Sequence, residues 1–163
     1  MHLAQVNIAQ ICHASIDAPE MESFTSRVEA INALARRSPG FVWTLEGEGG
    51  VGATRVEVFP GNPNIIIQLS KWESVESLFQ FAYKTAHAKL IATKHDWFVP
   101  VPNIANTALW WVADDHLPTI AEAKAAMARL HRDGPSPRAF DFATPFAASG
   151  EPITTRWPRK DCA

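Results

Sequence analysis

The chain has 163 residues, of which 47% are apolar and 20% are charged, and its formal net charge is -2. This length and composition predict a single globular domain with a substantial core. The near-neutral charge argues against nucleic acid as a partner, and no apolar run is long enough to span a membrane. The first residues lack the pattern of a signal peptide, so a cytoplasmic location is expected. Two cysteines, Cys12 and Cys162, cannot form a disulfide framework and match no zinc spacing.

The first part of the chain predicts a strand followed by a helix. Apolar and polar residues alternate over 2–11, which is typical of a strand. Apolar residues then recur at steps of three and four from Met21 to Leu34, which indicates an amphipathic helix. Asp17 and Glu20 are spaced as a capping box before this helix, and the Pro-Gly pair at 39–40 is a stop signal.

Strand signals dominate the next thirty residues. The pattern predicts strands at 41–46 and 64–72, the second containing three consecutive isoleucines. Residues 54–59 are expected to form a further strand or an extension of the sheet. The sequence "GEGGVG" (47–52) is followed by a strand pattern rather than a helix, so a hairpin connection is favoured over a phosphate-binding loop.

The remaining elements are a long helix, a strand and a final helix. The helix is expected over 74–94, with Ser74 as its cap, and the strand over 106–113. The final helix covers 119–134, where Thr119 and Glu122 form a capping box and a glycine ends the pattern.

In chain order these elements form a βαββαβ unit, which predicts a ferredoxin-like α+β fold. Its core is a four-stranded antiparallel sheet, and a helix is added at the C-terminal end. Residues 1–150 are expected to form the domain, and the proline-containing stretch 151–163 a flexible tail.

A resemblance appears at "LSKWESVESLFQFAYKTAHAKL" (69–90). A strand that ends in Trp-Glu-Ser, followed by a helix with aromatic residues and an Ala-His pair, resembles the dimeric α+β barrel superfamily. The antibiotic-biosynthesis-monooxygenase-like branch is the most similar. The segments "SPGFVW", "AHAKL" and "LWWV" further resemble an uncharacterised bacterial family within that superfamily, over roughly residues 2–146.

This resemblance implies a homodimer in which two sheets pack face to face into a barrel. Each protomer would keep a pocket between its sheet and its two core helices. The superfamily includes cofactor-independent oxygenases of polycyclic aromatic substrates, haem-degrading monooxygenases, haem-containing dehydratases and peroxidases, isomerases, and proteins without catalytic activity. Fold alone therefore does not choose among these functions.

His87 is the first candidate catalytic residue. Its predicted helix face also carries Phe79 and Tyr83, so a neutral imidazole there could act as a general base, with Tyr83 orienting it. The alternative is a histidine at the edge of a helix that only bonds Tyr83 or a backbone carbonyl.

Asn7 interrupts an otherwise small or apolar strand, and its amide could stabilise an enolate or phenolate. The alternative is a buried amide at a dimer interface. The haem-degrading branch resembles this chain in Asn7 and in "KTAH" (84–87), but the tryptophan of that branch has no clear equivalent. Haem degradation is therefore disfavoured, while haem binding with His87 as axial ligand stays an alternative.

Aromatic residues are candidates for the walls of a substrate pocket, although core packing is the more common explanation for such residues. The adjacent Trp110 and Trp111 should point to opposite faces of their strand. Trp97 follows the long helix, where a lid could lie. The proposed pocket residues are Trp43, Trp72, Phe79, Trp97 and Trp110.

The residues define no metal site, since neither His95 with Asp96 nor His116 with its neighbouring aspartates supplies three converging ligands. The sequence thus predicts a protein that binds a small apolar, aromatic or polyketide-like metabolite and needs no cofactor. A cofactor-independent monooxygenase or isomerase is the leading enzymatic hypothesis. The alternatives are a haem protein and a non-enzymatic ligand-binding or structural dimer.

Overall fold

The computed structural model describes residues 1–47 and 52–154. Its centre is one antiparallel sheet in which the first strand pairs with three others. The strands are β1 (His2–Ile11), β2 (Phe41–Thr44), β3 (Ile65–Trp72), β4 (Phe98–Val99) and β5 (Thr107–Val112).

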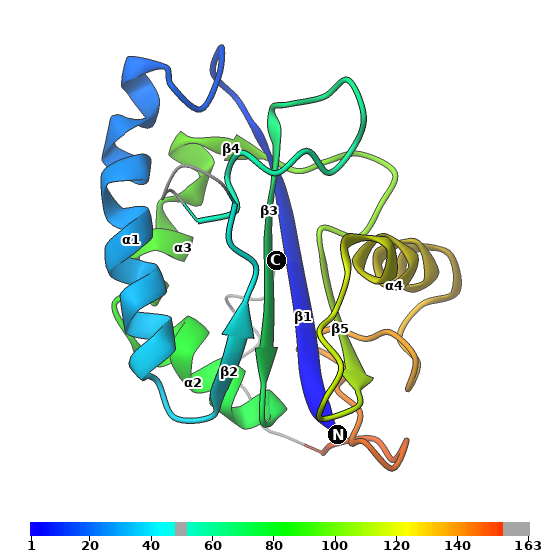
Figure 1. Cartoon of the computed structure of the whole chain (residues 1–163). Coiled ribbons are helices and arrows are strands. Elements are labelled where there is room, and N and C mark those ends of the chain that lie inside the picture. The colour runs from blue at the N-terminus through cyan, green and yellow to red at the C-terminus, as the bar shows by residue number, and fades with distance from the viewer. Residues whose placement is uncertain (48–51, 155–163) are drawn as a thin grey trace.

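Four α-helices and two short 3-10 turns flank this sheet. They are α1 (Glu22–Arg37), α2 (Val75–Lys84), α3 (His87–Ala92) and α4 (Ile120–Asp133), with 3-10 turns at Pro19–Met21 and Lys94–Asp96. Figure 1 views the sheet along its edge, with α1, α2 and α3 on one side and α4 on the other. No helix among residues 1–47 and 52–154 is long and apolar enough to cross a bilayer.

The strand order confirms the predicted α+β, ferredoxin-like fold. Across the sheet the order is β2–β3–β1–β5, so that the first and third strands lie together in the middle. The sheet contains a fifth strand that the sequence did not indicate. β1 is ten residues long and β5 pairs only with its first part, so the two-residue β4 pairs with the remaining edge at Gln10 and Ile11.

The long helix expected over 74–94 is interrupted. Ser74 caps its start by accepting a hydrogen bond from the Ser77 amide at 3.1 Å, but α2 ends at Lys84 and α3 begins at His87. Thr85 lies between them with an extended backbone. Its hydroxyl donates to the Phe81 carbonyl (2.6 Å) and accepts from the His87 amide (3.2 Å), so one side chain satisfies groups at both helix ends.

The two other helices differ in how well their starts were predicted. Thr119 and Glu122 form the expected capping box of α4. The capping box predicted at Asp17 and Glu20 is wrong, because a 3-10 turn at Pro19–Met21 precedes α1 and its start has no side-chain cap. Asp17 instead pairs with Arg55 at 2.6 Å, and this hydrogen bond holds the pKa of the Asp17 carboxyl below its ordinary value.

The strand expected at 54–59 is also wrong. This segment consists of turns, yet Val58 is buried and Val56 is half-buried against the α4 side of the sheet. The alternation of apolar residues is therefore real, but it reflects packing on a sheet rather than pairing within it. Of the hairpin expected at 47–52, residues 48–51 lie outside the described residues.

The face of the sheet beneath α4 carries one continuous apolar core, which we call the α4 cluster. It joins Ala4, Val6 and Ile8 of β1 with Met127 and Leu130 of α4. Residues 53–58 cover the rest of this face. The face that a barrel dimer would pair with its partner is thus buried within the single chain. The homodimer stays a prediction, and face-to-face packing of two sheets would require α4 to move.

The opposite face carries two separate apolar clusters. The Trp72 cluster lies at one end of the strands and contains Leu3, Trp72, Leu109, Phe81 and Phe140, among others. The Trp97 cluster lies at the other end and contains Ile11, Met21, Phe24, Val28 and Trp97.

The segment after α4 is part of the fold. Phe140 is fully buried and exchanges two backbone hydrogen bonds with Leu109 of β5 (2.8 and 2.9 Å). Ile153 packs against the Trp72 cluster, and its amide donates to the Pro145 carbonyl at 2.8 Å. Ordered packing therefore continues past the predicted boundary at residue 150, as far as the description of the chain extends at 154.

Candidate functional site

A band of polar side chains crosses the middle of the sheet on the α1–α3 side, between the Trp72 and Trp97 clusters. The register pairs Gln5 with Ser70, and Asn7 with both Gln68 and Thr107. Because directly paired residues of neighbouring strands point to the same side, and because Leu3 and Ile11 of β1 face these helices, the five side chains share that face. We call them the polar band.

Two members of the band are buried and connected to Trp72. The indole Nε1 of Trp72 donates to the Ser70 hydroxyl at 2.9 Å, and this hydroxyl donates to Oε1 of Gln5 at 2.8 Å. The second polar atom of the Gln5 side chain, Nε2, has no hydrogen-bond partner within the described part of the chain. This nitrogen is not among the fully buried unsatisfied atoms, so it reaches accessible space on the helix side.

The other members are open to solvent. Asn7 and Gln68 are exposed, although they lie in the middle of the two central strands. Nδ2 of Asn7 donates to the Thr107 hydroxyl (2.8 Å) and to the Asn106 carbonyl (3.3 Å). Both of its amide hydrogens are therefore engaged, and Asn7 offers a ligand its carbonyl oxygen as an acceptor. Nε2 of Gln5, by contrast, is an amide donor without a hydrogen-bond partner in the described residues.

His87 lies at the start of α3 and takes part in an aromatic stack. Its ring stacks on Phe81 (centroids 4.8 Å apart, planes at 25°), and Phe81 stacks on Trp72 (5.1 Å, 26°). Nδ1 of His87 lies 3.3 Å from the Ala82 carbonyl. A carbonyl only accepts hydrogen bonds, so this contact places the proton of the neutral ring on Nδ1 and leaves a lone pair on Nε2.

Burial lowers the pKa of His87 below its ordinary value, against the smaller opposing effect of the Ala82 carbonyl. A neutral imidazole with a free Nε2 lone pair is the form that a general base or a metal ligand requires.

The rings of Tyr83 and His87 pack against different aromatic residues. Its ring packs against Phe79 (4.9 Å) and Phe142 (5.5 Å), beside the segment that follows α4. Within the described residues, the His87 ring stacks on Phe81 and has its hydrogen-bond contact with the Ala82 carbonyl. The break at Thr85 explains this, since a continuous helix would have placed residues 83 and 87 on neighbouring turns of one face.

The five aromatic residues expected to line one pocket are divided between the two faces of the sheet. Trp72 belongs to the stack beside the polar band, and Phe79 packs with Tyr83 and Phe142. Trp97 is buried in its own cluster, with Nε1 donating to the Ser23 hydroxyl at 2.9 Å, so it is no lid. Trp43 and Trp110 pack on the opposite face, in the α4 cluster.

Trp110 and Trp111 do point to opposite faces, as their adjacency in the strand predicted. Trp110 belongs to the α4 cluster and Trp111 to the Trp72 cluster. Gln5 and Ser70 are the residues of the site that the sequence reasoning missed. Their signal was available, because Gln5 lies two residues before Asn7 and so shares its face of β1.

No group of three histidine, cysteine or carboxylate side chains within residues 1–47 and 52–154 could hold a metal ion. His116 instead lies 2.8 Å from Glu122, the glutamate of the α4 capping box. His95 lies beside Asp96 alone, at 3.3 Å.

Residues 2–156 match the model of the domain of unknown function DUF3291. The chain belongs to this family. The expectation of an uncharacterised family, made from the resemblance over residues 2–146, is thereby confirmed, and the DUF3291 match extends ten residues further. No curated protein sequence matches the chain. Among solved structures, the DUF3291 chain is similar to SnoaB, a cofactor-independent oxygenase from Streptomyces nogalater. The TM-score is 0.46 and the identity 16%, over 72% of this chain and 98% of that one.

Proposed function

We propose that this DUF3291 domain binds a small aromatic or polyketide-like metabolite against the polar band. The observation that carries the proposal is a row of amide and hydroxyl groups, of which those of Asn7 and Gln68 are exposed, in the middle of a sheet face whose two ends are apolar and aromatic. Binding sites for small molecules combine apolar walls with a few fixed polar groups in this way. The Ser70 hydroxyl and the Thr107 hydroxyl fix the orientations of Gln5 and Asn7.

The proposed reaction is a cofactor-independent oxygenation of an enolisable ketone. His87 would take a proton from the carbon beside the carbonyl, and Nε2 of Gln5 would donate a hydrogen bond to the resulting enolate oxygen. The carbanion then reacts with dioxygen. At a CH₂ group the peroxide that forms loses water and leaves a new C=O, so one oxygen atom enters the product and the other leaves as water.

Anthrone tests this proposal, because its CH₂ group can be oxidised to anthraquinone with uptake of one O₂ and release of one H₂O. Oxygen uptake and quinone absorbance should rise with the wild-type protein and fall for His87→Gln and for Gln5→Leu. His95→Gln is the matched control, since the His95 side chain is 76% exposed and should leave the rate unchanged.

Three results would decide among the hypotheses. Saturable anthrone binding without oxygen uptake would point to an isomerase or a binding protein. No saturable binding, together with identical behaviour of His87→Gln and wild type, would favour a structural role. Equal rates for Gln5→Leu and wild type would remove Gln5 from the mechanism.

Haem binding is the second candidate, and the Nδ1 contact of His87 with the Ala82 carbonyl is what favours it. This contact leaves Nε2 as the nitrogen that would ligate iron. Trp72 would not lie directly against a porphyrin at His87, because Phe81 lies between His87 and Trp72. Titration with hemin should give a Soret band that His87→Ala abolishes, and the absence of a defined band would end this hypothesis.

The proposal includes a homodimer. Because α4 covers the sheet face that a barrel would use, we expect the two copies to meet elsewhere and α4 to stay in place. Sedimentation equilibrium would measure the mass in solution. A monomer at all concentrations would contradict the dimer but not the binding site, because every named group of the polar band comes from one chain.

A further inference from the structure

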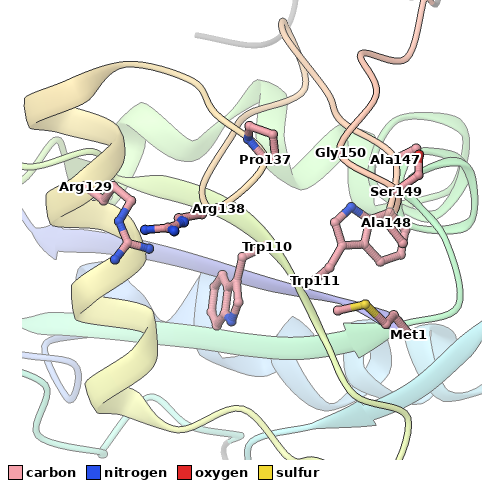
Figure 2. Close-up of a pocket in the computed structure, with 10 residues that line it drawn as sticks. All are labelled: Met1, Trp110, Trp111, Arg129, Pro137, Arg138, Ala147, Ala148, Ser149 and Gly150. Carbon is pink, nitrogen blue, oxygen red and sulfur yellow. The ribbon is translucent and has the colours of Figure 1, made fainter.

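A second candidate site lies at the β5 edge of the sheet, away from the polar band. It is a pocket of about 460 Å³ where α4, the first residue and the segment after α4 meet. This volume lies within the range of about 300–1,000 Å³ that is usual for small-molecule sites. Its walls, shown in Figure 2, are formed by Met1, Trp110, Trp111, Arg129, Pro137, Arg138, Ala147, Ala148, Ser149 and Gly150.

Two arginines without a carboxylate partner give this pocket its charge. Arg129 comes from α4 and Arg138 from the following segment, and Figure 2 shows both side chains reaching toward the space beside Trp110. Neither forms an ion pair within the described residues. Three other arginines do pair with carboxylates: Arg36 with Glu29 and Glu46, Arg55 with Asp17, and Arg132 with Asp133.

Asp133 is attracted by Arg129, but its carboxylate is paired with Arg132. It accepts a hydrogen bond from Arg132 at 2.7 Å, and this bond is the main cause of its lowered pKa, to which Arg129 adds only a long-range attraction. Two guanidinium groups that line one pocket repel each other unless an anion lies between them. The arrangement therefore favours occupancy by an oxyanion.

The rest of the wall suits a flat apolar body. Nε1 of Trp111 already donates to the Phe146 carbonyl at 2.8 Å, so this residue presents only its ring to a ligand. Trp110 is nearly buried in the α4 cluster and contributes ring surface at the base of the pocket. The remaining contacts come mainly from small residues of the turn 147–150, which the Gly150 amide closes by donating to the Ala147 carbonyl at 2.9 Å.

We infer that this pocket binds an aromatic carboxylate, with Arg129 and Arg138 holding the carboxylate and the two tryptophans contacting the ring. Arginine pairs with carboxylates through two parallel hydrogen bonds, which fixes the orientation as well as supplying energy. The site is independent of the polar band, since it shares no residue with it.

The probe is 2-naphthoate, titrated against the full chain by isothermal calorimetry and by quenching of tryptophan fluorescence. Saturable binding is expected, and Arg129→Gln and Arg138→Gln should each weaken it by about tenfold or more. The matched control is Arg132→Gln, which alters the same helix but an arginine that already has a partner. Circular dichroism should show that all three variants keep the fold.

Neutral 2-naphthamide tests the charge requirement and should bind at least about tenfold more weakly than 2-naphthoate. Binding of 2-naphthoate should also weaken as salt is raised, because the arginines are partly exposed. No saturable binding of 2-naphthoate, or equal binding to wild type and to both pocket variants, would overturn the inference. Loss of binding in Gln5→Leu with retention in Arg129→Gln would place the ligand at the polar band instead.

Discussion

The two faces of the sheet are built on different principles. The α4 face is one dry core, in which residues such as Val6, Ile67 and Met127 are almost fully buried. Among residues 1–47 and 52–154, its one buried charged side chain is Lys71, whose ammonium donates to the carbonyls of Asp114 (2.7 Å) and His116 (2.8 Å). The α1–α3 face is divided, with apolar clusters at its ends and the polar band between them.

This difference supports our proposal that a ligand binds on the α1–α3 face. An apolar face that is completely covered stabilises the domain and offers nothing to a ligand. Amides and hydroxyls left accessible in the middle of a sheet add little to stability, so their presence calls for a functional reason. The helix α4 covers most of the first face, and the pocket inferred for an aromatic carboxylate lies at its β5 edge. The second face keeps exposed polar side chains, against which we propose that a metabolite binds.

The largest expected effect is the loss of stability when a buried side chain of the α4 cluster is truncated. Met127 is fully buried in α4, so Met127→Ala removes apolar contacts and leaves a cavity. The free energy of unfolding should fall by about 2–5 kcal/mol. Urea denaturation followed by circular dichroism would measure it.

Leu117→Ala is the matched control for this prediction, because Leu117 precedes the same helix but is 52% exposed. Its effect should stay within about 0.5 kcal/mol. If the two variants lost equal free energy of unfolding, Met127 of α4 would not be part of a buried core.

A smaller loss of stability is expected when a buried hydroxyl of the polar band is removed. Ser70→Ala removes the hydroxyl between Trp72 and Gln5 and leaves Nε1 of Trp72 without its acceptor. Such unsatisfied buried groups cost about 1–3 kcal/mol each, so thermal unfolding should occur at a visibly lower temperature. The exposed Ser26 provides the control, and Ser26→Ala should leave the unfolding temperature nearly unchanged.

The third prediction concerns the pH dependence of stability. The folded protein lowers the pKa of His87 below its ordinary value of 6.5, so the unfolded chain binds the proton more readily. The contribution of a neutral His87 is therefore fully present above this pH and is lost as the pH falls below it. Replacing the histidine by Gln should flatten the stability profile between pH 6.5 and the lower folded-state pKa.

The measurement is the difference in free energy of unfolding between wild type and His87→Gln across this pH range. Any other groups that titrate in both proteins cancel in that difference. The exposed His95 is the control, and His95→Gln should leave the profile unchanged. If the wild-type profile coincided with that of His87→Gln, burial would not lower the pKa of His87.

The sequence predicted the framework of the fold because periodicity and caps report local geometry directly. Four strands, the cap at Ser74 and the Thr119–Glu122 box were all located. What it missed was decided by longer-range contacts. Residues 54–59 alternate like a strand, but they pack on the α4 face of the sheet instead of pairing with a strand. Asp17 pairs with Arg55 rather than capping a helix.

The candidate site was predicted less well, for reasons that also lie in three dimensions. One hydroxyl, that of Thr85, breaks the long helix and separates His87 from Tyr83. The amide of Asn7 was recognised as the polar group of β1, yet its donors are engaged by β5, which lies one hundred residues away in the chain. That engagement is why we propose Gln5 as the donor, and no spacing within β1 could reveal it.

Asn7→Ala should have the smallest effect on stability and thereby sharpen the contrast between the faces. The two hydrogen bonds of its amide are exposed, so their loss should cost less than about 1 kcal/mol. Ile8 is the adjacent residue on the other face and is 1% exposed, and Ile8→Ala should cost about 2–5 kcal/mol in the same urea titration. The free energy of unfolding lost at these two neighbouring positions of β1 would then differ several-fold. A loss at Asn7 as large as that at Ile8 would mean that the polar band is structural, whereas a small loss combined with weaker anthrone binding would identify Asn7 as a group retained for its ligand.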